Sequence, residues 1–193
     1  MSADPTQTSA AAPPTARGIG GWVPALAVVV LIAVVVGGGK LAAGTAGGAS
    51  GATQDVGGAV RITPLPGWST AAPPGAALPE LVLTRGGVTL DVLVVPGGGA
   101  DPVELATGYA REVLDPRYED LKIGQADAGA LASGVPTLRF GYIGVAEGVP
   151  TEGVATVATT SRAGVIFDAS APKGDLAWAV SDLETMIREA QVA

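Results

Sequence analysis

An alternation of apolar and polar residues around Gly86 and Gly87 is the clearest pattern in the chain. Positions 81, 83, 88, 90, 92 and 94 carry Leu or Val, an alternation that is typical of strands with one buried face. The two glycines between them suit the positive φ angles of a type I′ turn, so we predict a β-hairpin. The pairs expected across the turn are Arg85–Val88, Leu83–Leu90 and Leu81–Val92, with Val82, Thr84, Thr89 and Asp91 on the opposite face.

Two amphipathic helices are predicted on either side of a second group of strands. The first begins after Asp101, a good N-cap followed by Pro102, and ends at Leu114. Its expected buried stripe consists of Ala106, Tyr109, Ala110 and Val113. The second helix is expected within residues 173–191, with a stripe of Leu176, Val180, Leu183, Ile187 and Ala190. Alternating segments predict further strands at 60–62, 120–126, 135–146, 153–162 and 163–170, so the fold class is α+β, an antiparallel sheet flanked by helices.

The N-terminal part differs in composition from the rest. Residues 1–17 are small, polar and proline-containing, which predicts a disordered tail. Residues 18–39 are uncharged and would span about 33 Å as a helix, enough to cross a bilayer. A cleaved signal peptide is the alternative, but its apolar region is usually shorter, so we expect an uncleaved transmembrane anchor. Residues 40–58 then predict a flexible linker, and residues 59–193 a globular domain.

The charges flanking the predicted membrane span bear on its orientation. Arg17 stands before the span and Lys40 after it, so the positive-inside rule is nearly balanced. The N-terminal amine tips the balance towards a cytoplasmic N-terminus. We therefore expect a single-pass cell-membrane protein with an extracytoplasmic C-terminal domain.

The composition excludes several classes of function. The chain has no His and no Cys, so it offers no Ser–His or Cys–His pair and no ordinary zinc or copper site. We expect no cofactor and no metal. A net charge of −7 argues against a nucleic-acid partner, which would need a basic patch. A hydrolase that works through Asp91 and Asp168 alone is the remaining enzymatic alternative, and we do not expect it in a small domain without a deep-pocket signal.

Two segments resemble a known family. They are "ITPLPGW", residues 62–68, and the terminal helix after "APKGDLAWAV", residues 171–180. With the predicted order of elements, residues 60–190 resemble the PsbP-like domain, and most closely the LpqN-type envelope proteins of actinobacteria. The resemblance implies an α/β/α sandwich around an antiparallel sheet, and a non-enzymatic adaptor or ligand-binding module without catalytic residues. Envelope members of the family often carry a lipid-modified cysteine, which this chain lacks.

Several residues are candidates for binding. Trp68 is predicted to be structural, because a large ring after Pro66 and Gly67 seals a small core. Trp178 falls on the polar side of the last helix with Ser181, Asp182, Thr185 and Glu189; it predicts either a partner site or packing on a neighbouring loop, and both remain open. The second face of the sheet is expected to collect Arg139, Asp91, Asp168, Thr84, Thr89 and Thr137. A polar binding platform there is the less favoured interpretation beside a solvated or helix-covered face.

The segment "DPRYED" carries Asp115, Glu119 and Asp120 and raises the question of a calcium site. It lacks the spacing of a recognisable calcium loop, so we expect a solvated turn. The function predicted overall is a membrane-anchored extracytoplasmic adaptor for another envelope protein. A carrier or sensor of a small apolar or lipid ligand is the alternative.

Overall fold

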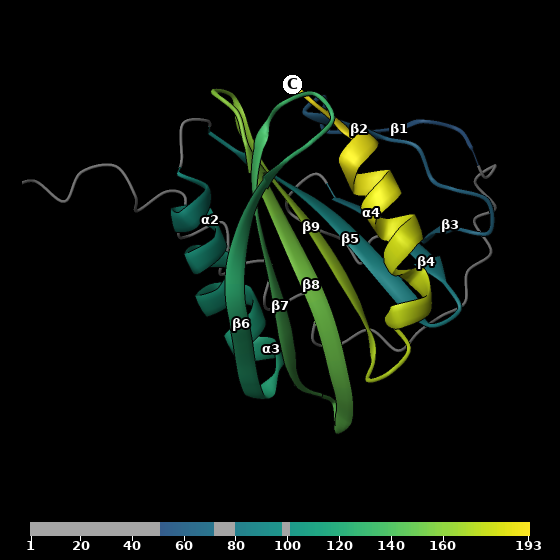
Figure 1. Ribbon diagram of the computed structural model, residues 1–193, viewed down its shortest axis with the longest axis vertical. Coiled ribbons are helices and arrows are strands. Elements are labelled where there is room, and N and C mark those ends of the chain that lie inside the picture. The colour runs from purple at the N-terminus through teal and green to yellow at the C-terminus, as the bar shows by residue number, and fades with distance from the viewer. Residues whose placement is uncertain (1–50, 72–79, 98–100) are drawn as a thin grey trace, which may run out of the picture.

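The computed structural model describes residues 51–71, 80–97 and 101–193. They form a seven-stranded antiparallel sheet with helices on both faces and a three-stranded sheet beside the C-terminus (Figure 1). The seven strands, in sheet order, are β3 (Ser69–Ala71), β4 (Glu80–Arg85), β5 (Val88–Pro96), β9 (Ala163–Pro172), β8 (Val149–Thr159), β7 (Pro136–Ala146) and β6 (Glu119–Ala130). The small sheet consists of β1 (Gln54–Val56), β2 (Val60–Ile62) and β10 (Gln191–Val192). The helical elements are α2 (Pro102–Tyr109), the π turn η1 (Ala110–Leu114), α3 (Asp115–Arg117), the 3₁₀ turn η2 (Ala177–Ala179) and α4 (Val180–Glu189).

The predicted hairpin is present as β4 and β5. All three predicted pairs, Arg85–Val88, Leu83–Leu90 and Leu81–Val92, are found. Gly86 and Gly87 have φ angles of 55° and 84°, the conformation for which glycine was expected. The prediction is confirmed to the residue because hairpin register follows from the turn and the alternation alone.

The first helix begins as predicted and continues beyond Leu114. The side chain of Asp101 accepts a hydrogen bond from the Val103 N–H, and Pro102 occupies the first turn. The α-helix then widens into η1 and resumes as α3. Pro116 has no N–H to donate to the helical ladder, which explains why the regular α-helix does not run through it unchanged.

The last helix presents a different face to the core than predicted. Its buried positions are Leu176, Ala179, Leu183, Met186 and Ala190, whereas Val180 and Ile187 are only partly buried. After Ala190 the chain is extended and pairs with β2 instead of remaining helical. Met186 faces the turn before Trp68, where its sulfur lies 3.4 Å from the Leu65 nitrogen.

Two apolar cores lie on the two faces of the large sheet. One is under α4 and includes Trp68, Leu83, Leu90 and Phe167. The other is under α2, η1 and α3 and includes Phe140. Figure 1 shows α4 in front of the sheet and α2 and α3 on its other side. The predicted three-layer arrangement is therefore confirmed.

The predicted domain limits need one correction. Residues 40–58 are predicted to be linker, yet Gln54–Val56 pair with β2 as strand β1, so folded structure already includes residue 54. The predicted tail (1–17), membrane span (18–39) and the rest of the linker up to residue 50 lie outside the described residues. Among the residues that are described, no helix is long and apolar enough to cross a membrane.

Candidate functional site

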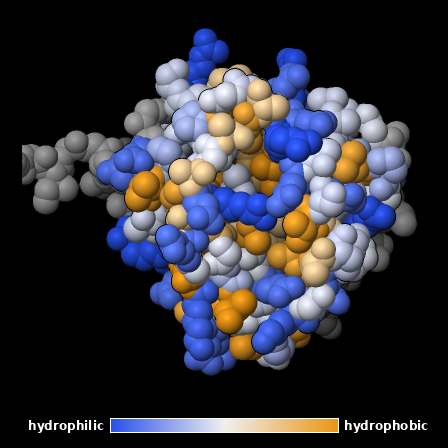
Figure 2. Space-filling view, in the orientation of Figure 1, coloured by the Kyte–Doolittle hydropathy of each residue, from blue (hydrophilic) through white to orange (hydrophobic). Residues whose placement is uncertain are grey.

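Helix α4 leaves part of its face of the sheet uncovered. A groove of about 600 Å³ lies between α4 and strands β6, β7 and β8. Its floor includes Gly141, Val154 and Ala169, and α4 contributes Leu183 and Ile187. Figure 2 shows this face, with hydrophobic side chains in the hollow and hydrophilic ones crossing it. Ile187 packs against the margin of the core and also lines this groove, so it is only partly buried.

Short side chains make the floor deep. Gly141 lies opposite Val154 across the β7–β8 ladder, and the neighbour of Val154 on β9 is Ala169. A Cβ built at Gly141 would meet nothing closer than the Gly153 oxygen at 3.8 Å. The missing side chain therefore leaves open space on the α4 side of the sheet.

One ion pair bridges the groove, and one backbone bond closes its end. The Arg139 guanidinium on β7 donates to the Glu184 carboxylate on α4 at 2.8 Å. Both side chains are roughly half exposed, so the ion pair contributes at most about 1 kcal/mol to the stability of the fold. Breaking it to admit a ligand therefore costs little. At the end of β6, the Ala132 N–H donates to the Arg188 carbonyl at 2.8 Å and holds the strand against the C-terminal end of α4.

A second hollow of about 530 Å³ continues the groove towards the start of α4. The two share Gly141, Val154, Leu176 and Val180 among their lining residues. The second is also lined by Ile123 and Ile143, whose side chains are 46% and 44% exposed. Together the two hollows form a continuous, mostly apolar channel along α4.

Trp178 lies outside this groove. Its ring packs on the β4–β5 turn, with the Arg85 guanidinium 5.3 Å from the ring centroid. A Cβ at Gly86 would lie 2.9 Å from the indole, so the ring rests directly on that glycine. The side chain is still 47% exposed. Trp178 thus packs on a neighbouring loop and also offers a free apolar surface, so the two predicted interpretations are compatible.

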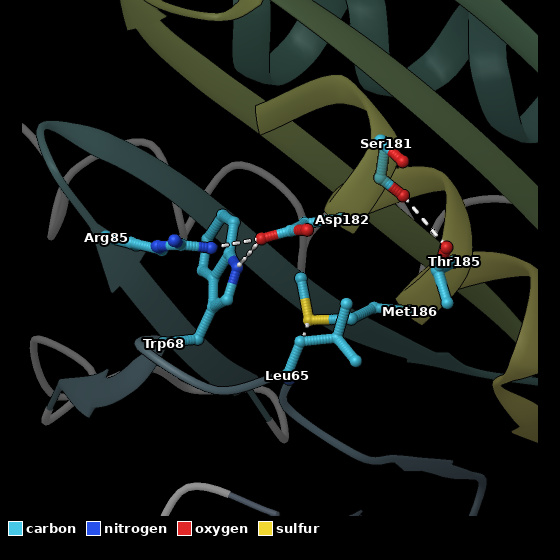
Figure 3. Close-up of polar contacts among 7 residues, drawn as sticks. All are labelled: Leu65, Trp68, Arg85, Ser181, Asp182, Thr185 and Met186. Carbon is cyan, nitrogen blue, oxygen red and sulfur yellow. Dashed lines mark hydrogen bonds and ion pairs between the residues drawn. The ribbon is translucent and has the colours of Figure 1, made fainter. Parts of the chain in front are cut away.

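Asp182 joins α4 to the Pro-Gly-Trp turn (Figure 3). Its carboxylate accepts a hydrogen bond from the Trp68 indole N–H at 3.1 Å and pairs with the Arg85 guanidinium. Trp68 is 2% exposed, which agrees with its predicted structural role. Thr185, another candidate, donates its hydroxyl to the Ser181 carbonyl of its own helix at 2.9 Å. Asp182 thus fixes α4 to the Pro-Gly-Trp turn, and neither Asp182 nor Thr185 lines the groove.

A buried polar cluster lies on the opposite face of the sheet, under α2 and α3. The carboxylate of Asp168 is fully buried and accepts hydrogen bonds from the hydroxyls of Tyr109 at 2.7 Å and Tyr142 at 2.8 Å. Burial raises the pKa of both tyrosines well above the usual value, so both remain protonated donors. Burial also raises the pKa of Asp168, although the two tyrosine hydrogen bonds oppose this shift.

Asp91 is the cross-strand neighbour of Asp168 in this cluster. Its side chain is 14% exposed, and its carboxylate lies 3.8 Å from the Arg117 guanidinium. Burial, reinforced by the charge of Asp168, raises the pKa of Asp91 to about 7 despite the opposing effect of Arg117. Glu80 is also close, and burial raises its pKa as well. The carboxyl groups of this cluster therefore bind protons more tightly than solvated ones do.

The predicted polar platform is divided between the two faces, which corrects the expectation of a single surface. Asp91 and Asp168 are paired neighbours under α3, and Thr84 and Thr89 share their face. Arg139 on β7 pairs with Thr156 on β8, and Thr156 pairs with Phe167 on β9. Because Phe167 belongs to the core under α4, Arg139 lies on that face, and Thr137 lies on it too. The register of the long strands decides these faces, and the segment patterns do not specify it.

The "DPRYED" segment forms α3 and the start of β6. Asp115 begins α3, whereas Glu119 and Asp120 belong to the strand. Within the described residues, no three His, Cys, Asp or Glu side chains gather as metal ligands.

Sequence reasoning missed the tyrosines of the buried cluster and the partner of Arg139. Tyr109 is predicted to lie on an apolar stripe, and helical periodicity indicates no partner for its hydroxyl. The chain has only three tyrosines, and Tyr109, Tyr118 and Tyr142 all belong to this core, which is the signal that could have been followed. No comparable signal connects Arg139 with Glu184, because they are far apart in sequence and adjoin only across the groove.

No protein-family profile and no curated protein matches the chain. Solved structures do. The chain is similar to cyanobacterial PsbP (CyanoP) from Synechocystis sp. PCC 6803, with 17% identity and a TM-score of 0.58 over 80% of this chain and 100% of that one. It is also similar to a Bacteroides thetaiotaomicron protein, with 10% identity and a TM-score of 0.54 over 75% of this chain and 49% of that one. LpqN of Mycobacterium tuberculosis, which is involved in cell envelope biogenesis, matches with 13% identity and a TM-score of 0.50 over 76% of this chain and 87% of that one. At these identities the likeness concerns the fold, and it does not establish the predicted special closeness to LpqN. The described residues have a PsbP-like α+β fold.

Proposed function

We propose that the protein is a non-catalytic adaptor of the cell envelope that holds a segment of another protein in the groove beside α4. The observation that carries this proposal is the groove itself. It is mostly apolar, its volume of about 600 Å³ is typical of a binding site, and the second hollow extends it along the helix. Exposed Ile123 and Ile143 at its open end offer apolar area to an incoming segment.

The absence of catalysis is supported by where the acidic residues lie. Asp91 and Asp168, the carboxylate pair of the hydrolase alternative, are under α3 on the other face of the sheet, and neither lines the two hollows. The described lining of the groove contains no His and no Cys, so it offers neither a Ser–His nor a Cys–His pair.

The proposed location rests on the sequence. Residues 18–39 are uncharged and long enough to span a bilayer, and they would anchor the domain by a short tether outside the cytoplasm. The involvement of LpqN, a structural neighbour, in cell envelope biogenesis is compatible with this location.

The proposal is tested by in-cell cross-linking and affinity purification of the full-length chain. Ile143→Lys places a charge at the mouth of the groove, whereas Val103→Lys makes the same change on α2, where Val103 is 54% exposed. A specific partner recovered with the native chain and Val103→Lys, and lost with Ile143→Lys, supports the adaptor. Equal recovery with all three chains shows that the groove is not the site, and Trp178→Ala then tests the other exposed apolar surface.

A carrier of a small apolar or lipid ligand is the second candidate. It is favoured by the floor of Gly141, Val154 and Ala169, which leaves room between sheet and helix for an apolar chain. Native mass spectrometry of the purified full-length protein separates the two candidates. A co-purified lipid that is displaced in Ile143→Lys supports the carrier, and a protein free of added mass contradicts it.

A further inference from the structure

Building on the proposed function, we infer that the partner enters the groove as an extended segment that pairs with the free edge of β6 over residues Ala126–Ala130. Strand β6 is an edge of the seven-stranded sheet, with β7 as its neighbour. It has 12 residues, whereas β3 at the opposite edge has 3. All residues of β6 except Leu121 are exposed. A long exposed edge presents a row of N–H and C=O groups that another strand can use.

The two halves of β6 differ in how well they can accept a strand. The pairing with β7 shifts register between Glu119 and Lys122 and again between Ile123 and Ala126. Such irregularities protect an edge from pairing with another chain. From Ala126 to Ala130, by contrast, β6 pairs with β7 residue by residue. This half is a regular template, and its only charged residue is Asp127.

The groove borders the edge of β6 and not merely one of its faces. Successive residues of a strand point to opposite faces, so a hollow on one face would be lined by every second residue. The five consecutive residues from Asp127 to Leu131 all line the groove. The bond from the Ala132 N–H to the Arg188 carbonyl fixes this end of β6 beside α4, and Figure 1 shows the β6–β7 turn reaching towards the end of that helix.

The chemistry of this border selects a polypeptide. An edge of alternating N–H and C=O groups is satisfied by another backbone, which a lipid chain does not supply. Charge indicates one feature of the segment. Asp127 is the cross-strand neighbour of Arg139, but the ion pair that Arg139 makes within the described residues is with Glu184 and not with Asp127. We therefore expect a Lys or Arg of the partner opposite Asp127, as in opposite-charge pairs between strands.

Selection from a random dodecapeptide library displayed on phage, against full-length protein in mild detergent, tests this inference. Enriched peptides should carry alternating apolar residues and a Lys or Arg, and a bound peptide should slow amide hydrogen exchange at residues 126–130 at least tenfold. Asp127→Lys should weaken such a peptide at least fivefold, and replacing its basic residue with Glu should restore binding to this variant. Far-ultraviolet circular dichroism checks that Asp127→Lys remains folded.

The possible outcomes separate the inference from the proposed function. Peptides that bind in the groove, as judged by their loss in Ile143→Lys, but leave exchange at 126–130 unchanged overturn strand pairing and leave the adaptor intact. A library that gives no peptide sensitive to Ile143→Lys overturns both. A dimer of the chain that dissociates in Asp127→Lys shows that a second copy occupies the edge and also overturns the inference.

Discussion

Replacing Asp91 by Asn tests the buried carboxylate cluster through the pH dependence of stability. Asp91 and Asp168 are adjacent across two strands, with Arg117 as the cation facing them, and Glu80, Tyr109, Tyr118 and Tyr142 as the other titratable neighbours. Burial raises the pKa of Asp91 to about 7, from 3.8 for an unperturbed side chain. The folded state therefore holds a proton that the unfolded chain releases near pH 4.

The sign and size of the effect follow from this difference. A carboxyl group with a raised pKa contributes most to stability when both states are protonated, and the contribution falls as the pH rises from about 4 to about 7. Each pH unit in that range lowers the free energy of unfolding by up to about 1.4 kcal/mol. The total loss of stability due to Asp91 is therefore about 4 kcal/mol as an upper bound. The raised pKa of Asp168 acts in the same direction. The native protein should thus be less stable at pH 8 than at pH 5.

Urea unfolding of the full-length protein, followed by tryptophan fluorescence between about pH 5 and pH 8, measures this dependence. Few other groups titrate in the window, because the chain has no His. Asp91→Asn should flatten the profile and be more stable than the native chain at pH 8. Asp175→Asn, the same change at an exposed position, should keep the native profile. Native stability that is constant or rises from pH 5 to pH 8, or an unchanged slope in Asp91→Asn, refutes the reasoning.

Three further predictions concern stability and use the same unfolding assay. Trp68→Ala should cost about 3–5 kcal/mol, because it empties a fully packed site and leaves Asp182 without its indole donor; a loss below about 1 kcal/mol contradicts the core role. Tyr109→Phe removes one of two hydroxyl donors to a fully buried carboxylate and should cost about 1–3 kcal/mol, whereas an unchanged midpoint indicates that Asp168 does not depend on it. Gly153→Ala should cost about 1–3 kcal/mol, because its Cβ would lie 2.2 Å from the Tyr142 ring, while Gly141→Ala, whose Cβ has room, should be nearly neutral; equal effects would count against this packing.

The features that the sequence predicted correctly depend on neighbouring residues. The β4–β5 hairpin follows from an alternation and two glycines within a span of fifteen residues, and the start of α2 follows from Asp101 and Pro102. Both are determined within a few residues, so no knowledge of the remaining chain was necessary.

The features that the sequence did not predict depend on distant segments. Arg139 lies on a different face from Asp91 because the register of four long strands places it there. The buried face of η2 and α4 includes Ala179 and Met186 because the turn before Trp68 packs against that side, while the side with Val180 opens onto the groove. Helical periodicity identifies an apolar stripe but not what will cover it, and therefore the groove itself could not be predicted.

The most direct test of the central claim is site-specific photo-cross-linking in cells. A photoreactive amino acid at Ile143 samples the groove mouth, and one at Val103 samples α2 with a similar exposure, 44% against 54%. We expect a discrete protein adduct from position 143 that is absent from position 103. Adducts of equal intensity at both positions, or none at position 143, would contradict the proposal that the groove beside α4 binds a protein.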